Sequence, residues 1–272
     1  MSGTASIAAD LHIRLRARLW LYAIAALLLL FLVLPTLIVI PMSFSDSTFL
    51  EFPPRHLSLR WYGHFLNSPA WRQAAATSLK VAAATAVVAT VLGTAAAYGL
   101  FASGLQRARL LSGVLLAPII VPGILVAIGI FYVYVQLGLV NTLAGLVLAD
   151  AMLALPLVLI VMTAALRSYD FAQELAARSL GASRLRAFFA VTLPQLRFAV
   201  LTSAILGFLT GFDEVVIALF VSGGSNATLT RDMFNALRDQ IDPTIAAIST
   251  AMIAVSSLLL AGLQALGGRN NR

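Results

Sequence analysis

The sequence has no cysteine and few charged residues. Of its 272 residues 60% are hydrophobic, and the mean hydropathy is +0.94. Only 11% are charged, whereas a typical soluble protein has about 25%. The lack of cysteine excludes a disulfide framework and thiolate metal sites. So few charges cannot cover a soluble domain of this length, and the composition therefore predicts an integral membrane protein.

Motifs of common catalytic and nucleotide-binding sites are also missing. The chain contains no GxxxxGKS/T phosphate loop, and its only lysine is Lys80. The three histidines, His12, His56 and His64, are scattered, and none has the HExxH spacing of a zinc site. No GxSxG occurs, and no histidine lies in a long apolar run. We therefore expect a chain that is not an enzyme, with no catalytic residue, no cofactor and no metal.

Six apolar runs are long enough to cross a membrane as helices, which takes about 20 residues each. They cover residues 19–43, 74–100, 111–136, 142–166, 198–221 and 244–266. The first run is too long for a signal peptide and has no A-x-A-like site after it, so we expect it to remain uncleaved. The predicted fold is an all-α membrane protein with six transmembrane helices within 19–266, between tails at 1–18 and 267–272.

The arginines are divided unevenly between the segments that connect these runs. If the N-terminus lies inside, twelve arginines are cytoplasmic, at positions 14, 16, 18, 107, 109, 167, 178, 184, 186, 197, 269 and 272, and five are outside, at 55, 60, 72, 231 and 238. This bias follows the positive-inside rule and predicts that both termini are cytoplasmic. It also argues against a nucleic-acid partner as the reason for the net charge of +7, because no continuous basic face is left.

Two longer segments are expected on the outer side. The first, at 44–73, contains turn residues followed by a group of aromatic side chains around Trp61, which is typical of a helix at the membrane surface. The second, at 222–243, begins with Ser-Gly-Gly-Ser and continues with an amphipathic pattern at 229–240. Both are predicted to carry short helices outside the membrane.

The inner segment between the fourth and fifth runs, at 167–197, is much longer than the other inner connection, at 101–110. Residues 172–180 contain neither glycine nor proline, and Gly181 then offers a helix stop. A second helix is expected at 183–191, whose first residue is a good cap, before Pro194 breaks the chain. Such a small, partly basic projection either docks in a groove of a partner protein or is a surface helix pair without one.

Three acidic residues lie inside the apolar runs, Asp150 in the fourth and Asp213 and Glu214 in the fifth. A carboxylate at the centre of a membrane helix costs about 2.5–3.5 kcal/mol, so such residues usually face a bundle interior or a water-filled path. On a continuous helix Asp213 and Glu214 would point about 100° apart. The residues either line a path for a cationic substrate or make polar contacts between helices. The first alternative is favoured for the pair and the second for Asp150.

The inner segment resembles the cytoplasmic loop of permeases of binding-protein-dependent ATP-binding-cassette (ABC) importers. Those permeases carry the pattern EAA, three residues, Gly, nine residues, a branched apolar residue, any residue and Leu-Pro. Six positions match here: Ala176, Ala177, Gly181, Val191, Leu193 and Pro194. The first position does not match, because it is Leu175, with Glu174 one residue earlier.

The resemblance covers residues 20–266, and the stretches 211–223 and 229–250 look like the second permease of spermidine/putrescine-type transporters. It implies the type I ABC importer fold in the bacterial inner membrane, among lipids. It also implies three kinds of protein partner: a second, homologous permease that forms a heterodimer, two copies of a cytoplasmic ATPase, and a periplasmic substrate-binding protein. ATP would then be bound by the partner ATPase and not by this chain.

The resemblance, together with the in-span carboxylates and the amphipathic pattern, gives expected roles to residues. An ATPase-coupling loop is expected from Glu174, Ala176, Ala177, Arg178, Gly181, Ala182, Leu193 and Pro194. A substrate path for a small cationic solute, a polyamine, is expected along Asp150, Asp213 and Glu214. The amphipathic helix at 229–240 is expected to contact the binding protein or to close an outer gate, unless it is merely interfacial.

Other possible functions would require other sequence features or other substrates. Relatives of the same subgroup handle aminoethylphosphonate, opines and other small amines, so these remain alternative substrates. A secondary carrier would need ion sites near the midplane and usually an internal repeat with broken helices. A membrane scaffold would not need acidic residues within its spans. The sequence shows no repeat, and a carrier has no need of a long docking loop, so the importer permease is the favoured hypothesis.

Overall fold

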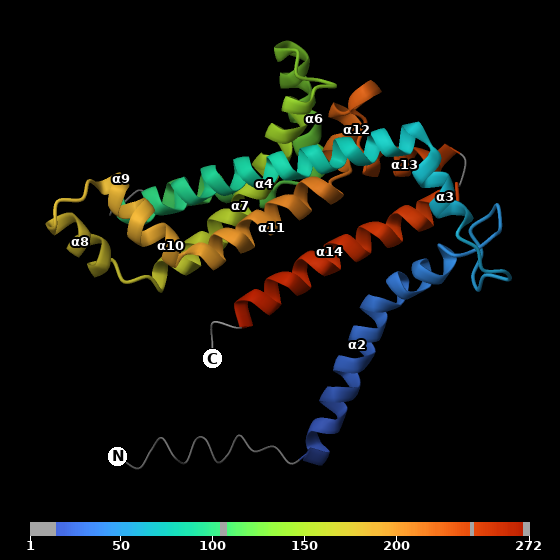
Figure 1. Ribbon diagram of the computed structural model, residues 1–272, viewed down its shortest axis with the longest axis horizontal. Helices are drawn as coiled ribbons and strands as arrows, with labels where there is room; N and C mark the ends of the chain where they lie inside the picture. Colours follow the sequence, from blue (N-terminus) through green and yellow to red (C-terminus); the bar gives the residue numbers. More distant parts are fainter. Residues whose placement is uncertain (1–14, 104–107, 240–241, 269–272) are drawn as a thin grey trace. The chain divides into compact units, whose positions relative to one another are not determined.

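The computed structural model (Figure 1) describes residues 15–103, 108–239 and 242–268. Within these ranges the chain is helical, apart from connecting loops and a β-bridge between Ser45 and Leu57. Four helices are long and apolar enough to cross a membrane, or up to six if each of two bent helix pairs counts as one span. The predicted all-α architecture is confirmed, whereas the cytoplasmic placement of the termini stays a prediction.

The helices succeed one another along the described chain. They are α2 (Leu15–Met42), α3 (Arg60–Asn67), α4 (Pro69–Ser103), α5 (Ala108–Ile120), α6 (Gly123–Leu137), α7 (Leu143–Arg167), α8 (Ala172–Ser179), α9 (Arg184–Ala187), the π-helix η1 (Phe188–Thr192), α10 (Leu193–Gln195), α11 (Arg197–Asp213), α12 (Val216–Val221), the 3₁₀ turn η2 (Gly224–Asn226), α13 (Leu229–Asp239) and α14 (Thr244–Gly268). The chain divides into two compact units, Met1–Gly63 with Asp242–Thr250, and His64–Ile241 with Ala251–Arg272.

In the first unit the loop after α2 is held by the start of α3. The Ser43 and Tyr62 hydroxyls lie 2.7 Å apart, and the Trp61 indole N–H donates a hydrogen bond of 3.0 Å to the Ser47 carbonyl oxygen. Side chains 19–35 of α2 are exposed although most are large and apolar. A helix of this composition is stable only against lipid or another apolar surface.

The core of the second unit lies between α4, α7 and α11, which run side by side (Figure 1). The helices approach closely because small residues face one another. A Cβ atom placed on Gly207 of α11 would lie 3.1 Å from the Ala86 Cα atom, and one on Gly211 would lie 3.2 Å from the Ala82 Cα atom. Gly93 of α4 instead makes room for a side chain, because a Cβ atom placed on it would lie 2.8 Å from the Val158 Cβ atom of α7. Such close backbone contacts are typical of helix pairs in membranes.

The contact between α4 and α7 gives a stability prediction. Gly93→Val should lower the free energy of unfolding by about 1–3 kcal/mol, because it overpacks a filled interface. A Cβ atom at this position would meet the Val158 Cγ1 atom at 2.5 Å. Gly99→Val is the matched control, because Gly99 lies on the same helix and has nothing within 4 Å of its Cβ position. Thermal unfolding of the two variants in detergent checks the difference, and equal melting temperatures would contradict this packing.

The prediction of one continuous helix at 111–136 is wrong. The helices α5 and α6 meet at 102°, around the residues Val121 and Pro122. Proline cannot donate the hydrogen bond that would continue α5, and it disfavours a helical conformation in the residue before it. Figure 1 shows α6 turned away from the direction of α4 and α7. The apolar run therefore bends within the second unit and does not form a straight rod.

The prediction of one helix at 198–221 is also wrong, because α11 ends at Asp213 and α12 begins at Val216. Between them the backbone of Glu214 is extended, with φ −64° and ψ 123°. The expectation that Asp213 and Glu214 point about 100° apart on one helix therefore fails. The reason is local: Glu214 bonds to the first turn of α12 and so takes the place of a helix-capping residue.

The inner segment follows its prediction in part. The helix expected at 172–180 is α8, and Ser183 caps α9 as predicted, its hydroxyl accepting from the Arg186 N–H at 3.3 Å. However, α9 has four residues and passes into the π-helix η1, so the α-helix predicted at 183–191 is wrong beyond Ala187. The chain bends by 79° at Leu196 and not at Pro194, because proline is tolerated in the first turn of α10.

Candidate functional site

The predicted coupling loop is a helical hairpin built on one glycine. Gly181 has φ +93°, a conformation that side chains with a Cβ atom rarely adopt. The turn is closed by backbone bonds from Gly181 N–H to the Arg178 carbonyl oxygen at 3.0 Å and from Ala182 N–H to the Ala177 carbonyl oxygen at 3.1 Å. Nothing lies within 4 Å of a Cβ atom placed on Gly181, so the backbone conformation and not the space demands glycine.

The hairpin exposes large apolar side chains. Leu175 is 57% exposed, Leu180 90% and Leu185 72%. Ala176 and Arg178 are exposed beside them, and Ala177 is half-buried. Isolated apolar side chains are common on protein surfaces, but a group of this kind on one short loop marks an interaction surface. We call Leu175, Leu180 and Leu185 the leucine ridge.

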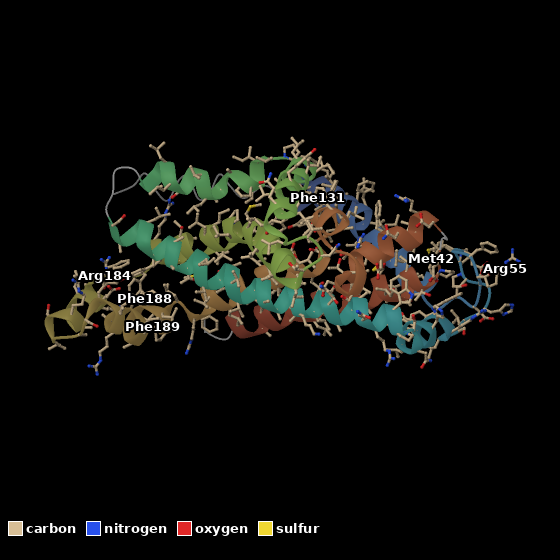
Figure 2. The ribbon with its side chains drawn as sticks, turned by 90° about the horizontal axis from the view of Figure 1, so that it is seen from above. Met42, Arg55, Phe131, Arg184, Phe188 and Phe189 are labelled. Carbon is tan, nitrogen blue, oxygen red and sulfur yellow. The ribbon has the colours of Figure 1, made fainter. Side chains whose placement is uncertain are left out.

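A pocket of about 250 Å³ opens next to the leucine ridge. It is lined by Phe101, Ala102, Phe171, Glu174, Leu175, Arg178 and Arg184. Figure 2 shows Arg184, Phe188 and Phe189 close together in the region of α8, α9 and η1. Among the remaining residues expected in the coupling loop, Ala182 and Leu193 are half-buried, and Pro194 is exposed.

Glu174 faces the inside of the unit. Its side chain is only 4% exposed. One carboxylate oxygen accepts a hydrogen bond from the Tyr98 hydroxyl at 2.7 Å, and the other accepts from the Thr192 hydroxyl at 2.6 Å. The loop therefore exposes Leu175 at this turn, whereas the Glu174 carboxylate is hydrogen-bonded to residues of the same chain. Sequence reasoning missed Tyr98 and Thr192, because neither belongs to a recognisable motif.

The break between α11 and α12 brings the acidic residues together. The Glu214 carboxylate accepts hydrogen bonds from the Ile217 and Ala218 N–H groups at 2.8 Å and 2.9 Å, and the Thr230 hydroxyl donates to the Glu214 carbonyl oxygen at 2.7 Å. The last residue of α11, Asp213, has an exposed side chain. Glu214 is thus fixed by α12, whereas the Asp213 side chain is exposed.

Asp150 approaches the same break from α7. Its side chain is 3% exposed, and its Oδ1 atom has no hydrogen-bond partner among the described residues. It interacts electrostatically with Glu214, with Asp213 and with Tyr134 of α6. The structure therefore assembles the three acidic residues that the sequence singled out, and adds Tyr134. Within the described ranges no three histidine, aspartate or glutamate side chains are placed to hold a metal ion.

The predicted outer helix is α13, which ends at Asp239; the predicted last residue, Gln240, lies outside the described residues. The Leu229 N–H group donates to the Ser78 hydroxyl of α4 at 2.8 Å, which fixes the start of α13 to the core. Burial raises the pKa of the Asp232 carboxyl group, and the neighbouring Arg231 guanidinium partly offsets this rise. Phe234 and Leu237 remain exposed, so α13 has an apolar face that nothing in the described chain covers.

Comparison with known proteins identifies the family. A family model described as binding-protein-dependent transport system inner membrane component matches residues 89–271. The chain belongs to this family and is a permease subunit of an ABC importer. The putrescine transport system permease protein PotI of Escherichia coli is 30% identical over 247 residues, which cover 88% of each protein. The spermidine/putrescine transport system permease protein PotC of Haemophilus influenzae is 28% identical over 241 residues, or 89% of this chain and 93% of that protein.

Two solved structures share the fold. A chain of a bacterial ABC transporter involved in the import of the acidic polysaccharide alginate matches with a TM-score of 0.72 at 17% identity, over 93% of this chain and 98% of that chain. A chain of a bacterial alginate ABC transporter in complex with an alginate pentasaccharide-bound periplasmic protein matches with a TM-score of 0.62 at 13% identity, over 94% and 99%. Identities this low establish the architecture of an importer permease and not the substrate. The candidate membrane spans agree with an inner membrane component of a transport system. The relatives are permease subunits and not enzymes.

Proposed function

We propose that this chain forms half of the translocation path for a small cationic solute, a polyamine, in an ABC importer of the bacterial inner membrane. The observation that carries the proposal is that Asp150 of α7 interacts electrostatically with Asp213 and Glu214, which lie at the break between α11 and α12. The names of the relatives, which refer to putrescine and spermidine transport, support the same substrate class.

The helix break suits a cation for two reasons. The carbonyl groups in the last turn of α11 lack partners within that helix and carry the negative end of its dipole. The exposed Asp213 carboxylate lies at the same end and adds a full charge. Transport proteins commonly place substrate or ion sites where a membrane helix is interrupted. A primary ammonium group would be attracted there by both contributions, while Glu214 stays bonded to α12 and shapes the site.

The leucine ridge supports the proposed partners. Apolar side chains at the end of a helical hairpin are suited to fill a groove on another protein. The pocket beside the ridge also presents Arg178 and Arg184, which suit an acidic side chain of the partner. We infer that a cytoplasmic ATPase docks here, present in two copies, one for this chain and one for a second, homologous permease. ATP is bound by that ATPase, so this chain needs no cofactor, and both of its termini are cytoplasmic.

The substrate is tested by uptake in proteoliposomes that contain the complete complex. Uptake of radiolabelled putrescine should require the binding protein and ATP, and excess unlabelled spermidine should compete with it. Aminoethylphosphonate and an opine serve as competitors for the alternative substrates. If only these zwitterionic or acidic amines compete, the polyamine assignment is wrong, although the importer role is unaffected.

We further propose that α13 contributes to the surface where the periplasmic binding protein docks. The chain has no cysteine, so a single cysteine can be introduced without a background signal. The variant Arg238→Cys should form crosslinks to the binding protein during turnover, because Arg238 is an exposed residue in the last turn of α13. Leu180→Cys is the control, because it is exposed on the proposed cytoplasmic loop and should form none. Failure of Arg238→Cys to crosslink would indicate a helix that only lies at the interface.

A further inference from the structure

Glu174 is a buried carboxylate on an otherwise exposed helix. Its neighbours Gln173, Leu175 and Ala176 on α8 are exposed, whereas Glu174 itself is 4% exposed. Glutamate is almost never buried to this degree unless its charge is compensated. The burial needs an explanation, because the same helix is proposed to contact another protein with its opposite face.

The compensation comes from two hydroxyl groups on different elements. Tyr98 belongs to α4 and Thr192 ends η1, and they donate to the two carboxylate oxygens at 2.7 Å and 2.6 Å. Hydrogen bonds to an ionised oxygen are about twice as strong as those between neutral groups. One side chain of α8 therefore joins the helix to the long core helix α4 and to the segment that leads into α11. We call Glu174, Tyr98 and Thr192 the carboxylate tie.

The surroundings of the tie are aromatic. The Tyr98 ring lies 4.6 Å from that of Phe188 and stacks on Phe171 at 6.4 Å, and the Arg184 guanidinium lies 5.9 Å from its centre. The Tyr169 hydroxyl lies 3.1 Å from that of Thr192. The Glu174 side chain is only 4% exposed, and such burial strengthens its hydrogen bonds and makes their loss more costly.

Thr192 places one end of the carboxylate tie on the segment that leads into α11. Thr192 is the last residue of the π-helix η1, and π-helices are rare and often lie at functional sites. The chain continues through α10 into α11, which ends at Asp213. A contiguous set of contacts therefore runs from α8 to both α4 and α11, the kind of physical connection that coupling between distant sites requires.

We propose that Glu174 is a positioning residue that passes movement of α8 to α4 and α11, and so links the ATPase-facing loop to the substrate path. This inference rests on the proposed function, because it takes α8 to be the helix that the ATPase contacts. A purely structural role, in which the tie only holds the loop in place, is the competing explanation.

A second hydrogen bond provides a matched control. The Gln195 amide donates to the Gln173 side-chain oxygen, and both residues are exposed. This bond also joins α8 to the segment before α11, but water can replace it at little cost. Breaking this bond removes one contact between the same segments and leaves no buried charge without its hydrogen-bond donor.

The test compares Thr192→Val, Tyr98→Phe, their double variant and Gln195→Ala in the complete complex in proteoliposomes. Valine has nearly the shape of threonine, and phenylalanine that of tyrosine, so each change removes one hydroxyl donor and little else. Each tie variant should still co-purify with the ATPase and hydrolyse ATP, while uptake per ATP hydrolysed falls about tenfold. Gln195→Ala should behave as the unaltered chain. Uptake per ATP hydrolysed should be higher in Glu174→Gln than in Glu174→Ala, because the glutamine amide oxygen still accepts one hydrogen bond.

Unchanged uptake per ATP in both Thr192→Val and Tyr98→Phe would overturn the inference. So would loss of ATPase co-purification in those variants, since this outcome would show that the tie only holds the loop in place. If the unaltered chain itself fails to co-purify with an ATPase, the proposed function fails, and that failure is distinct because it does not depend on any substitution.

Discussion

Replacing Gly181 by valine should uncouple ATP hydrolysis from uptake and lower uptake at least about tenfold, while the helix bundle still assembles. The residue has φ +93°, and a β-branched side chain in that region costs about 1–2 kcal/mol or more. The backbone would relieve this strain by leaving the left-handed conformation. The turn between α8 and α9 would then open, and the leucine ridge would no longer present Leu180 in its present place. Binding-protein-stimulated ATP hydrolysis and uptake, measured in the same proteoliposomes, check the result.

The matched control for this experiment is Gly138→Val. Gly138 has φ +66° at the end of α6 and, like Gly181, has nothing within 4 Å of its Cβ position. The two substitutions therefore bring similar backbone strain, but only Gly181 lies in the proposed docking loop. The control should lower stability without changing uptake per ATP. Normal stimulated ATP hydrolysis and uptake in Gly181→Val would count against the coupling loop.

Neutralising Asp213 should reduce polyamine uptake about tenfold or more, because two unit charges 4 Å apart attract each other by about 4 kcal/mol at an effective dielectric constant of 20. Asp213→Asn keeps the size and much of the hydrogen-bonding capacity of the side chain and removes the charge. The complex should assemble normally, because the Asp213 side chain is exposed in this chain. Uptake of putrescine at several concentrations would show the loss.

Two further variants separate charge from structure in this region. Asp46→Asn removes an exposed carboxylate from the loop after α2, and uptake should not change. Glu214→Gln replaces one of two acceptors at the start of α12 by a donor, so we expect lower stability of the assembled complex. Wild-type uptake by Asp213→Asn would refute the electrostatic path and would leave the polyamine assignment without support from the acidic residues.

The features that depend on local sequence are predicted well. Apolar runs of sufficient length give the positions of α2, α4, α7 and α14 to within a few residues, because the hydrophobic length needed for a span is set by the membrane. The stop at Gly181 and the cap at Ser183 are also predicted correctly, since each depends on one residue and its immediate neighbours. The loop motif is recognisable for the same reason, because its residues lie close together along the chain.

Three features are not predicted, of which two are local breaks in apolar runs and one depends on a distant residue. The break at Glu214 lies inside the run expected to form one helix at 198–221, and there the Glu214 carboxylate bonds to the first turn of α12. The Tyr98 partner of Glu174 is 76 residues away in the sequence, and Tyr98 looks like an ordinary aromatic residue of a membrane helix. The bend at Pro122 escapes prediction because proline is also tolerated inside membrane helices, as at Pro156 in α7.

The π-helical segment η1 also bears on the fixed spacing of the loop motif. A π turn contains one more residue than an α turn could hold, so 188–192 act as a built-in single-residue insertion. The nine residues between Gly181 and Val191 include α9 and most of this insertion. Deleting one of them would let the segment relax to an ordinary α-helix, and since four α-helical residues turn the chain about as far as five π-helical ones, the residues after it would keep their rotational phase. The fixed spacing of the motif thus includes one extra residue, which the π-helix accommodates directly before Thr192 bonds to Glu174.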